Sequence, residues 1–92
     1  MPQLPDHQIA TRLASLDGWT RDADMIGKTY ELPSFMDAIA FVERVATLAE
    51  AADHHPDIDI RYRNVHIALS THDAGGITQK DFDLAGDIEA IG

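Results

Sequence analysis

The hydrophobic pattern of this chain changes period at Pro56, and this change limits the folds open to it. Before Pro56, apolar side chains recur every three or four residues along one predicted helix face, at Phe35, Ile39, Val42, Ala46, Ala49 and Ala52. After Pro56 they recur at every second residue, as in a strand with one buried face. Proline cannot continue a helical hydrogen-bond ladder and disfavours helical angles at the residue before it. The sequence therefore predicts a long helix that ends at His54-His55-Pro56 and leads into a strand.

The segment after Pro56 is predicted to form an antiparallel hairpin. Two apolar runs alternate with polar or small residues, and they comprise Ile58, Ile60 and Tyr62, then Val65, Ile67 and Leu69. The Arg63-Asn64 pair between the runs is expected to form the turn. The first run would then be a half-buried strand that carries Tyr62.

The amino-terminal part is predicted to form a short helix and another hairpin. Asp6 is expected to cap the helix, which continues to Leu16. Short strands are expected over residues 19–21 and 25–32, joined by Asp22-Ala23-Asp24. This hairpin would precede the long helix.

Two possible capping boxes indicate where helices begin. Ser34 is followed by Asp37, and Thr78 by Asp81, at the spacing of a capping box. After the break at Gly75-Gly76, a closing helix is expected through Leu84, Ala85, Ile88 and Ile91. The order α-β-β-α-β-β-α, with tight strand pairs, predicts an α+β fold in which helices cover one face of an antiparallel sheet.

Composition restricts the possible functions. The 92 residues suit a single domain spanning 1–92, and 45% apolar content is typical of globular chains. Lys and Arg number 7 against 16 Asp and Glu, a formal net charge of −9 that argues against nucleic acid and anionic membranes. Cysteine is absent, which removes thiol chemistry and disulfides. Without a signal peptide or an apolar span of about 18 residues, a cytoplasmic protein is expected, and its small size favours a homo-oligomer.

Three histidines lie at predicted ends of elements and are candidates for chemistry. They are His54, His55 and His72, and an imidazole with a pKa of about 6.5 can donate or accept a proton near neutrality. Each could instead be a surface or hydrogen-bonded structural residue, and Asp81 could serve only its capping box. A zinc site of His54, His72 and Asp81, as in a metal-dependent hydrolase, is a further alternative. Adjacent histidines lack the i, i+4 spacing of helical zinc motifs, which counts against it.

The spacing of these residues resembles the signature of the pterin-4a-carbinolamine dehydratase family. It reads Glu50, three residues, His54-His55-Pro56, five residues, Tyr62, nine residues, His72, eight residues and Asp81. The resemblance continues through residues 71–78, 80–81 and 32–35 and covers roughly residues 19–91. The chain departs from it at Ile58, where relatives often carry an aromatic residue.

The resemblance implies a fold, an assembly and a reaction. The fold would be a four-stranded antiparallel sheet with three helices on one face, assembled into homodimers or homotetramers. The reaction would be loss of water from 4a-hydroxytetrahydropterin, which aromatic amino acid hydroxylases release, to give quinonoid dihydropterin. The pterin is the substrate, and no metal or other cofactor is implied. An aromatic amino acid hydroxylase would be a possible partner.

The resemblance also assigns roles to residues. His54 and His72 would be the acid and the base, His55 would hold the pterin ring, and Asp81 would orient a histidine. Further substrate contacts are expected at Glu50, Asp53, Pro56, Tyr62 and Thr71. Family members also act as partner-binding modules: one stabilises dimers of a homeodomain transcription factor, and some relatives resemble assembly chaperones for carbon-fixation enzymes. That role is the alternative, although the intact histidine and aspartate set favours the enzyme.

Overall fold

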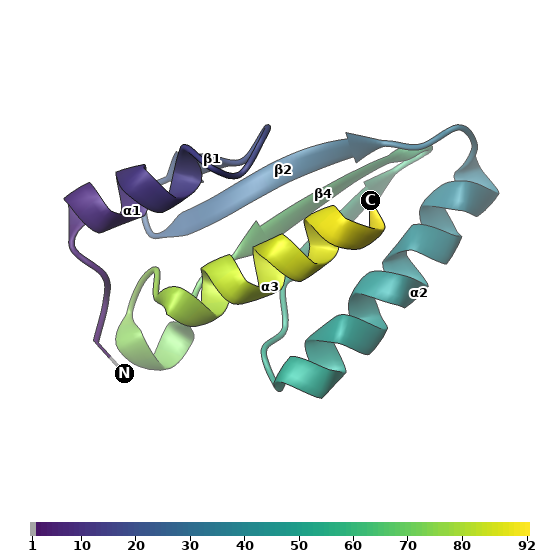
Figure 1. Cartoon of the computed structure of the whole chain (residues 1–92). Helices are drawn as coiled ribbons and strands as arrows, with labels where there is room; N and C mark the ends of the chain where they lie inside the picture. The colour runs from purple at the N-terminus through teal and green to yellow at the C-terminus, as the bar shows by residue number, and fades with distance from the viewer. Residues whose placement is uncertain (1) are drawn as a thin grey trace.

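The computed structural model describes residues 2–92 and contains one four-stranded sheet and three α-helices (Figure 1). In chain order the elements are α1 (Asp6–Leu13), β1 (Thr20–Asp22), β2 (Met25–Glu31), α2 (Phe35–Ala52), β3 (Asp57–Arg61), β4 (Asn64–Leu69), the 3-10 helix η1 (His72–Ala74) and α3 (Gln79–Ile91). The strand order is β1-β2-β4-β3, and every neighbouring pair is antiparallel. The predicted α+β class and element order are confirmed. Among residues 2–92, no helix has the length and apolar character needed to cross a membrane.

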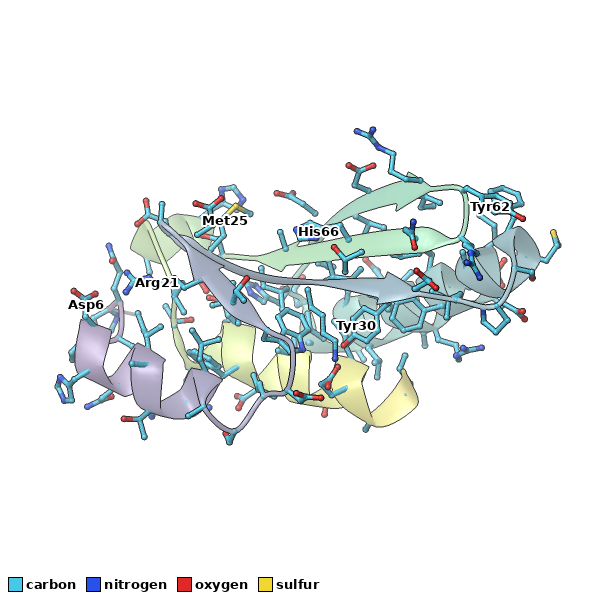
Figure 2. The ribbon with its side chains drawn as sticks, turned by 90° about the horizontal axis from the view of Figure 1, so that it is seen from above. Asp6, Arg21, Met25, Tyr30, Tyr62 and His66 are labelled. Carbon is cyan, nitrogen blue, oxygen red and sulfur yellow. The ribbon has the colours of Figure 1, made fainter. Side chains whose placement is uncertain are left out.

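One face of the sheet is packed against helices and the other is open. Helices α2 and α3 lie beneath the sheet in Figure 1, and α1 flanks it at β1. The core of the strands and these two helices includes Ile26, Tyr30, Val65, Ile67, Leu69, Ala38, Phe41, Val45, Ala49, Leu84, Ala85 and Ile88. Burying a large apolar side chain contributes about 1.5 to 3 kcal/mol. Figure 2 looks onto the open face, where His66 Nδ1 lies 2.8 Å from Thr29 Oγ1.

The apolar stripe predicted along α2 is largely wrong. The buried residues of this helix are Ala38, Phe41, Val45 and Ala49. Of the predicted set, only Ala49 is buried, Ile39 and Val42 are half-buried, and Phe35, Ala46 and Ala52 are exposed. Apolar residues occupy more than one face of this helix, so periodicity alone could not identify the face that meets the sheet.

Strand β3 is more exposed than the predicted half-buried strand. It lies at the edge of the sheet and pairs only with β4, and Ile58 is 37% exposed. Because Arg61 pairs with Asn64, the turn comprises Tyr62 and Arg63, one residue earlier than predicted. Tyr62 has a φ of 55° and is 70% exposed, so it belongs to the turn and not to the strand.

The amino-terminal boundaries also differ from the prediction. Pro5 is the N-cap of α1, and Asp6 is the first helical residue, where its carboxylate favours the helix dipole. The helix ends at Leu13, before the predicted end at Leu16. The first hairpin turns on Ala23-Asp24 alone, and β1 includes the residue before them.

The two predicted capping boxes differ in completeness. At α3, Thr78 and Asp81 form both reciprocal bonds of the box. At α2, Ser34 Oγ accepts from the Asp37 N–H at 3.1 Å, but it donates its own proton to the Asp37 carboxylate at 2.9 Å. The Asp37 side chain therefore binds the Ser34 hydroxyl in place of the Ser34 backbone N–H.

A polar cluster joins the last turns of α3 to β2. Lys28 Nζ donates to both oxygens of Glu89, at 3.0 and 2.9 Å, and the Tyr30 hydroxyl donates to Glu89 Oε2. Burial raises the pKa of Tyr30, and the hydrogen bond to Glu89 and its charge raise it further. Burial also acts to raise the pKa of Glu89, but the hydrogen bonds from Tyr30 and Lys28 outweigh it, so this pKa is lowered. The cluster therefore favours the ionised form of Glu89.

Replacing Glu89 tests this cluster. Glu89→Gln is expected to lower the free energy of unfolding near pH 7 by about 1 to 2 kcal/mol, because partly exposed charge-assisted bonds are lost. Since the folded-state pKa is lowered, this stabilisation is present above the unfolded-state value of about 4.3 and disappears as the pH falls through the folded-state value. Urea unfolding should show a difference in the free energy of unfolding between wild type and Glu89→Gln at pH 7, and this difference should shrink in acid.

The control is Glu43→Gln, because Glu43 is exposed on α2. It should change the free energy of unfolding by about 0.5 kcal/mol or less. A Glu89→Gln deficit of equal size at neutral and acid pH would contradict the account.

Candidate active site

A pocket of about 210 Å³ opens where the end of α2, the end of β4 and the start of α3 meet. In Figure 1 the end of α2 and η1 both lie on the lower side of the molecule. The pocket is lined by Asp53, His54, His55, Ser70, Thr71, His72, Asp73 and Lys80. The structure therefore brings His72, from the segment after β4, to the adjacent pair His54 and His55 at the end of α2.

The end of α2 directs two of these histidines. Asp53, at the C-cap, has a φ of 49°, a left-handed conformation that Asp tolerates better than most residues. The His54 N–H then reaches back to the Ala49 carbonyl at 3.1 Å. Pro56 follows and precedes β3, so the helix cannot continue past the histidines. His54 and His55 are thus held at the junction between α2 and β3.

A closed loop after β4 carries the third histidine. Thr71 and Gly76 form an isolated bridge, with the Thr71 N–H 2.9 Å from the Gly76 carbonyl. Within the loop, η1 begins at His72, and Gly75 has a φ of 72°, which favours glycine. The bridge therefore fixes both ends of the short turn that carries His72.

The Asp81 carboxylate is fully buried beside the pocket. Its Oδ2 accepts from the Thr78 N–H and from the Thr71 hydroxyl, both at 2.9 Å. Its Oδ1 lies 2.5 Å from Nε2 of His54, whose side chain is 11% exposed. Among the predicted residues, the structure thus joins Asp81 directly to His54.

His55 has a different partner. Its Nε2 lies 2.5 Å from Glu50 Oε1, and both side chains are largely exposed. Exposed pairs of this kind contribute little to stability. Glu50 thus contacts His55 and can orient its ring.

Three predicted contact residues do not line the pocket, and Glu50, the partner of His55, is one of them. Tyr62 lies at the turn between β3 and β4, toward one end of the molecule in Figure 2, away from Asp6 at the other. Pro56 is half-buried next to His55. Among the predicted residues, Asp53 and Thr71 do line the pocket.

Three lining residues were missed by the sequence analysis. They are Ser70, Asp73 and Lys80, and each is adjacent to a predicted residue in the chain. Asp73 and Lys80 belong to the segments that carry the family resemblance, but neither this nor adjacency to a predicted residue shows which side chains face a pocket.

The arrangement suits proton transfer. Two imidazoles can act as acid and base, and carboxylates and an ammonium group can bind a polar substrate. Within the part of the chain that the structure describes, no group of three or more His, Asp and Glu side chains is placed to hold a metal ion. His54, His72 and Asp81 thus do not form the three-ligand cluster that the zinc alternative needs.

Comparison with known proteins identifies the family. Residues 2–91 match the sequence model of a family described as pterin 4 alpha carbinolamine dehydratase. The chain belongs to the pterin-4a-carbinolamine dehydratase family. A relative from Roseiflexus sp. (strain RS-1), provisionally named pterin-4-alpha-carbinolamine dehydratase, is 63% identical, with 97% of this chain and 96% of the relative covered. A relative of the same provisional name from Chloroflexus aurantiacus is 55% identical, with 99% of this chain and 98% of the relative covered.

Solved structures share the fold of this family member. The crystal structure of a transcriptional coactivator/pterin dehydratase from Brucella melitensis matches with a TM-score of 0.93 at 31% identity, over 97% of each chain. A pterin dehydratase-like protein described as a RuBisCO assembly factor in the alpha-carboxysome matches with a TM-score of 0.65 at 23% identity, over 79% of this chain and 84% of the other. At that identity the second match shows the fold alone.

The buried carboxylate of this family member can be tested by substitution. Asp81→Ala is expected to lower the free energy of unfolding by about 2 to 4 kcal/mol, because it removes a cap and leaves buried donors unpaired. Asp83→Ala is the matched control, since Asp83 is exposed on the same helix and accepts from Gln79 Nε2 in an exposed hydrogen bond. Urea unfolding of both variants measures the difference, and equal losses would argue against a structural role for Asp81.

Proposed function

We propose that this protein removes water from a 4a-hydroxytetrahydropterin to give the quinonoid dihydropterin, with His54 and His72 as the proton-transferring groups. The proposal is carried by one observation: His54, His55 and His72 line a single pocket in a member of this family. Relatives at 55 to 63% identity whose provisional names state this activity support it.

The reaction is balanced by two proton transfers. One imidazolium donates a proton to the C4a hydroxyl, the C4a–O bond breaks, and water leaves. A neutral imidazole takes the N5 proton, and the electron pair of the N5–H bond becomes the second bond between N5 and C4a. The acid has then lost one proton and the base has gained one, and exchange with solvent resets both. The step is balanced without a metal or redox cofactor, so none is part of the proposal.

The two histidines have different surroundings, which supports a division of roles. His54 is mostly buried and bound to Asp81, which we propose orients its ring and sets its tautomer. His72 is exposed on η1. His55, oriented by Glu50, would hold the pterin ring, and the Asp53 carboxylate would accept from the donor edge of its pyrimidine.

The setting of the reaction is also part of the proposal. The substrate would come from an aromatic amino acid hydroxylase in the cytoplasm. It is the form in which that enzyme releases its pterin cofactor after hydroxylation. A homodimer or homotetramer is supported by four exposed large apolar side chains, Phe35, Met36, Ile58 and Tyr62. Sedimentation equilibrium tests the assembly, and a mass of 10.1 kDa, that of one chain, would contradict it.

Substitution of the histidines tests the proposed roles. His54→Ala and His72→Ala are each expected to lower turnover by about 10² to 10⁴-fold, the usual contribution of general acid–base catalysis. The substrate is a chemically generated 4a-hydroxytetrahydropterin, and its ultraviolet absorbance change measures the rate. Circular dichroism checks that each variant is folded.

The control is His66→Ala, because His66 lies on the open face of the sheet and outside the pocket. It should retain wild-type turnover. Full activity in His54→Ala or His72→Ala would show that the proposed roles are wrong.

A further inference from the structure

We infer that Thr71 is a positioning residue, which with Thr78 forms a directional chain of hydrogen bonds that turns the Asp81 carboxylate toward His54. This chain of hydrogen bonds keeps the proton of neutral His54 on Nε2. The Nδ1 atom of His54 is then left to accept a proton. The catalytic consequence rests on the proposed function, whereas the direction of the hydrogen bonds follows from the contacts of an ionised Asp81 carboxylate.

The direction begins at Asp81 Oδ2. The Thr78 N–H, 2.9 Å away, can only donate, so Oδ2 accepts. Thr71 Oγ1 lies 2.9 Å from the same oxygen, and an ionised carboxylate has no proton to give, so the Thr71 hydroxyl donates as well. Both contacts on Oδ2 are therefore donated to it.

The next bond in the chain is then determined. Thr71 Oγ1 also lies 2.7 Å from Thr78 Oγ1, and either oxygen could be the donor by distance alone. A hydroxyl has one proton, and Thr71 gives its proton to Asp81. Thr78 must therefore donate to Thr71. The protons run from Thr78 to Thr71 and from Thr71 to Asp81.

The consequence appears at the other carboxylate oxygen. Oδ1 is an acceptor and lies 2.5 Å from Nε2 of His54, so Nε2 carries the proton. A neutral imidazole has one N–H, which leaves Nδ1 with a free lone pair. Thr71 and Asp81 are 7% and 0% exposed. If the Thr71 hydroxyl is removed, water therefore does not readily take its place as a donor to Asp81.

The same residue connects the two histidines. Thr71 directly precedes His72 and forms the bridge with Gly76 that closes the turn. Its hydroxyl therefore ties the backbone beside His72 to the carboxylate that holds His54. Because its one proton is given to Asp81, we assign this hydroxyl to positioning in place of the substrate contact implied by the family resemblance.

The first test reads the His54 tautomer by two-bond proton–nitrogen NMR of the imidazole ring, at a pH where the ring is neutral. The wild-type protein should show the Nε2–H tautomer. Thr71→Val removes the hydroxyl at nearly constant volume and should give a mixture of tautomers, because the carboxylate keeps one fewer donor. Thr71→Ser keeps a hydroxyl and should restore the wild-type spectrum. If Thr71→Val does not fold, Thr71→Ala replaces it.

The second test measures turnover of the same variants. Thr71→Val should lower kcat about 10- to 100-fold, the effect of losing one hydrogen bond to a charged group, with little change in KM. Thr71→Ser should recover most of the loss. A raised KM with unchanged kcat would instead indicate a substrate contact and overturn the inference.

The two tests separate this inference from the proposed function. A wild-type protein with the proton on Nδ1, or a Thr71→Val spectrum equal to that of wild type, overturns the hydrogen-bond chain whatever the activity. If the tautomers are as expected but the protein has no dehydratase activity, the hydrogen-bond chain is supported and the proposed function is contradicted.

Discussion

This part of the structure depends on the hydrogen bonds of the buried Asp81 carboxylate. An unpaired charge is costly to bury, so a fully buried carboxylate requires donors from its surroundings. Its hydrogen-bond partners are the cap of α3 at Thr78, the segment after β4 at Thr71 and the end of α2 at His54. Satisfying this one side chain therefore joins the end of α2 to the start of α3 and to the segment after β4.

Helix capping and site assembly use the same group. Asp81 completes the capping box of α3 with one oxygen and contacts His54 with the other. A residue that looks structural in the sequence is thus also bonded to a candidate catalytic histidine. The pocket lies at the ends of helices and strands. There the left-handed residues Asp53 and Gly75 turn the backbone, so nearby side chains point away from the regular elements.

The sequence predicted the features that depend on local pattern. The change of period at Pro56, the paired β-runs and the capping box of Thr78 and Asp81 are properties of near neighbours, and they correctly indicated the α+β order. The spacing of the histidines correctly indicated the family. Local signals were sufficient here because each element begins or ends at a residue with a strong backbone preference.

Other features depend on tertiary packing and could not be predicted in this way. The buried face of α2 was misassigned because several of its faces are apolar and only contact with the sheet selects one. Tyr62 was placed in a strand because alternation extends past the last paired residue, whereas the register of β3 and β4 ends at Arg61. The pocket positions of Asp73 and Lys80 come from the way η1 and the start of α3 meet α2, which the pattern of neither segment contains.

The account's central claim is that the histidine pocket accelerates loss of water from a pterin carbinolamine. The most direct measurement is the decay of a chemically generated 4a-hydroxytetrahydropterin with the purified wild-type protein, in the presence of a metal chelator. The account predicts acceleration over the spontaneous reaction that persists with the chelator. A decay rate equal to that without protein would contradict it.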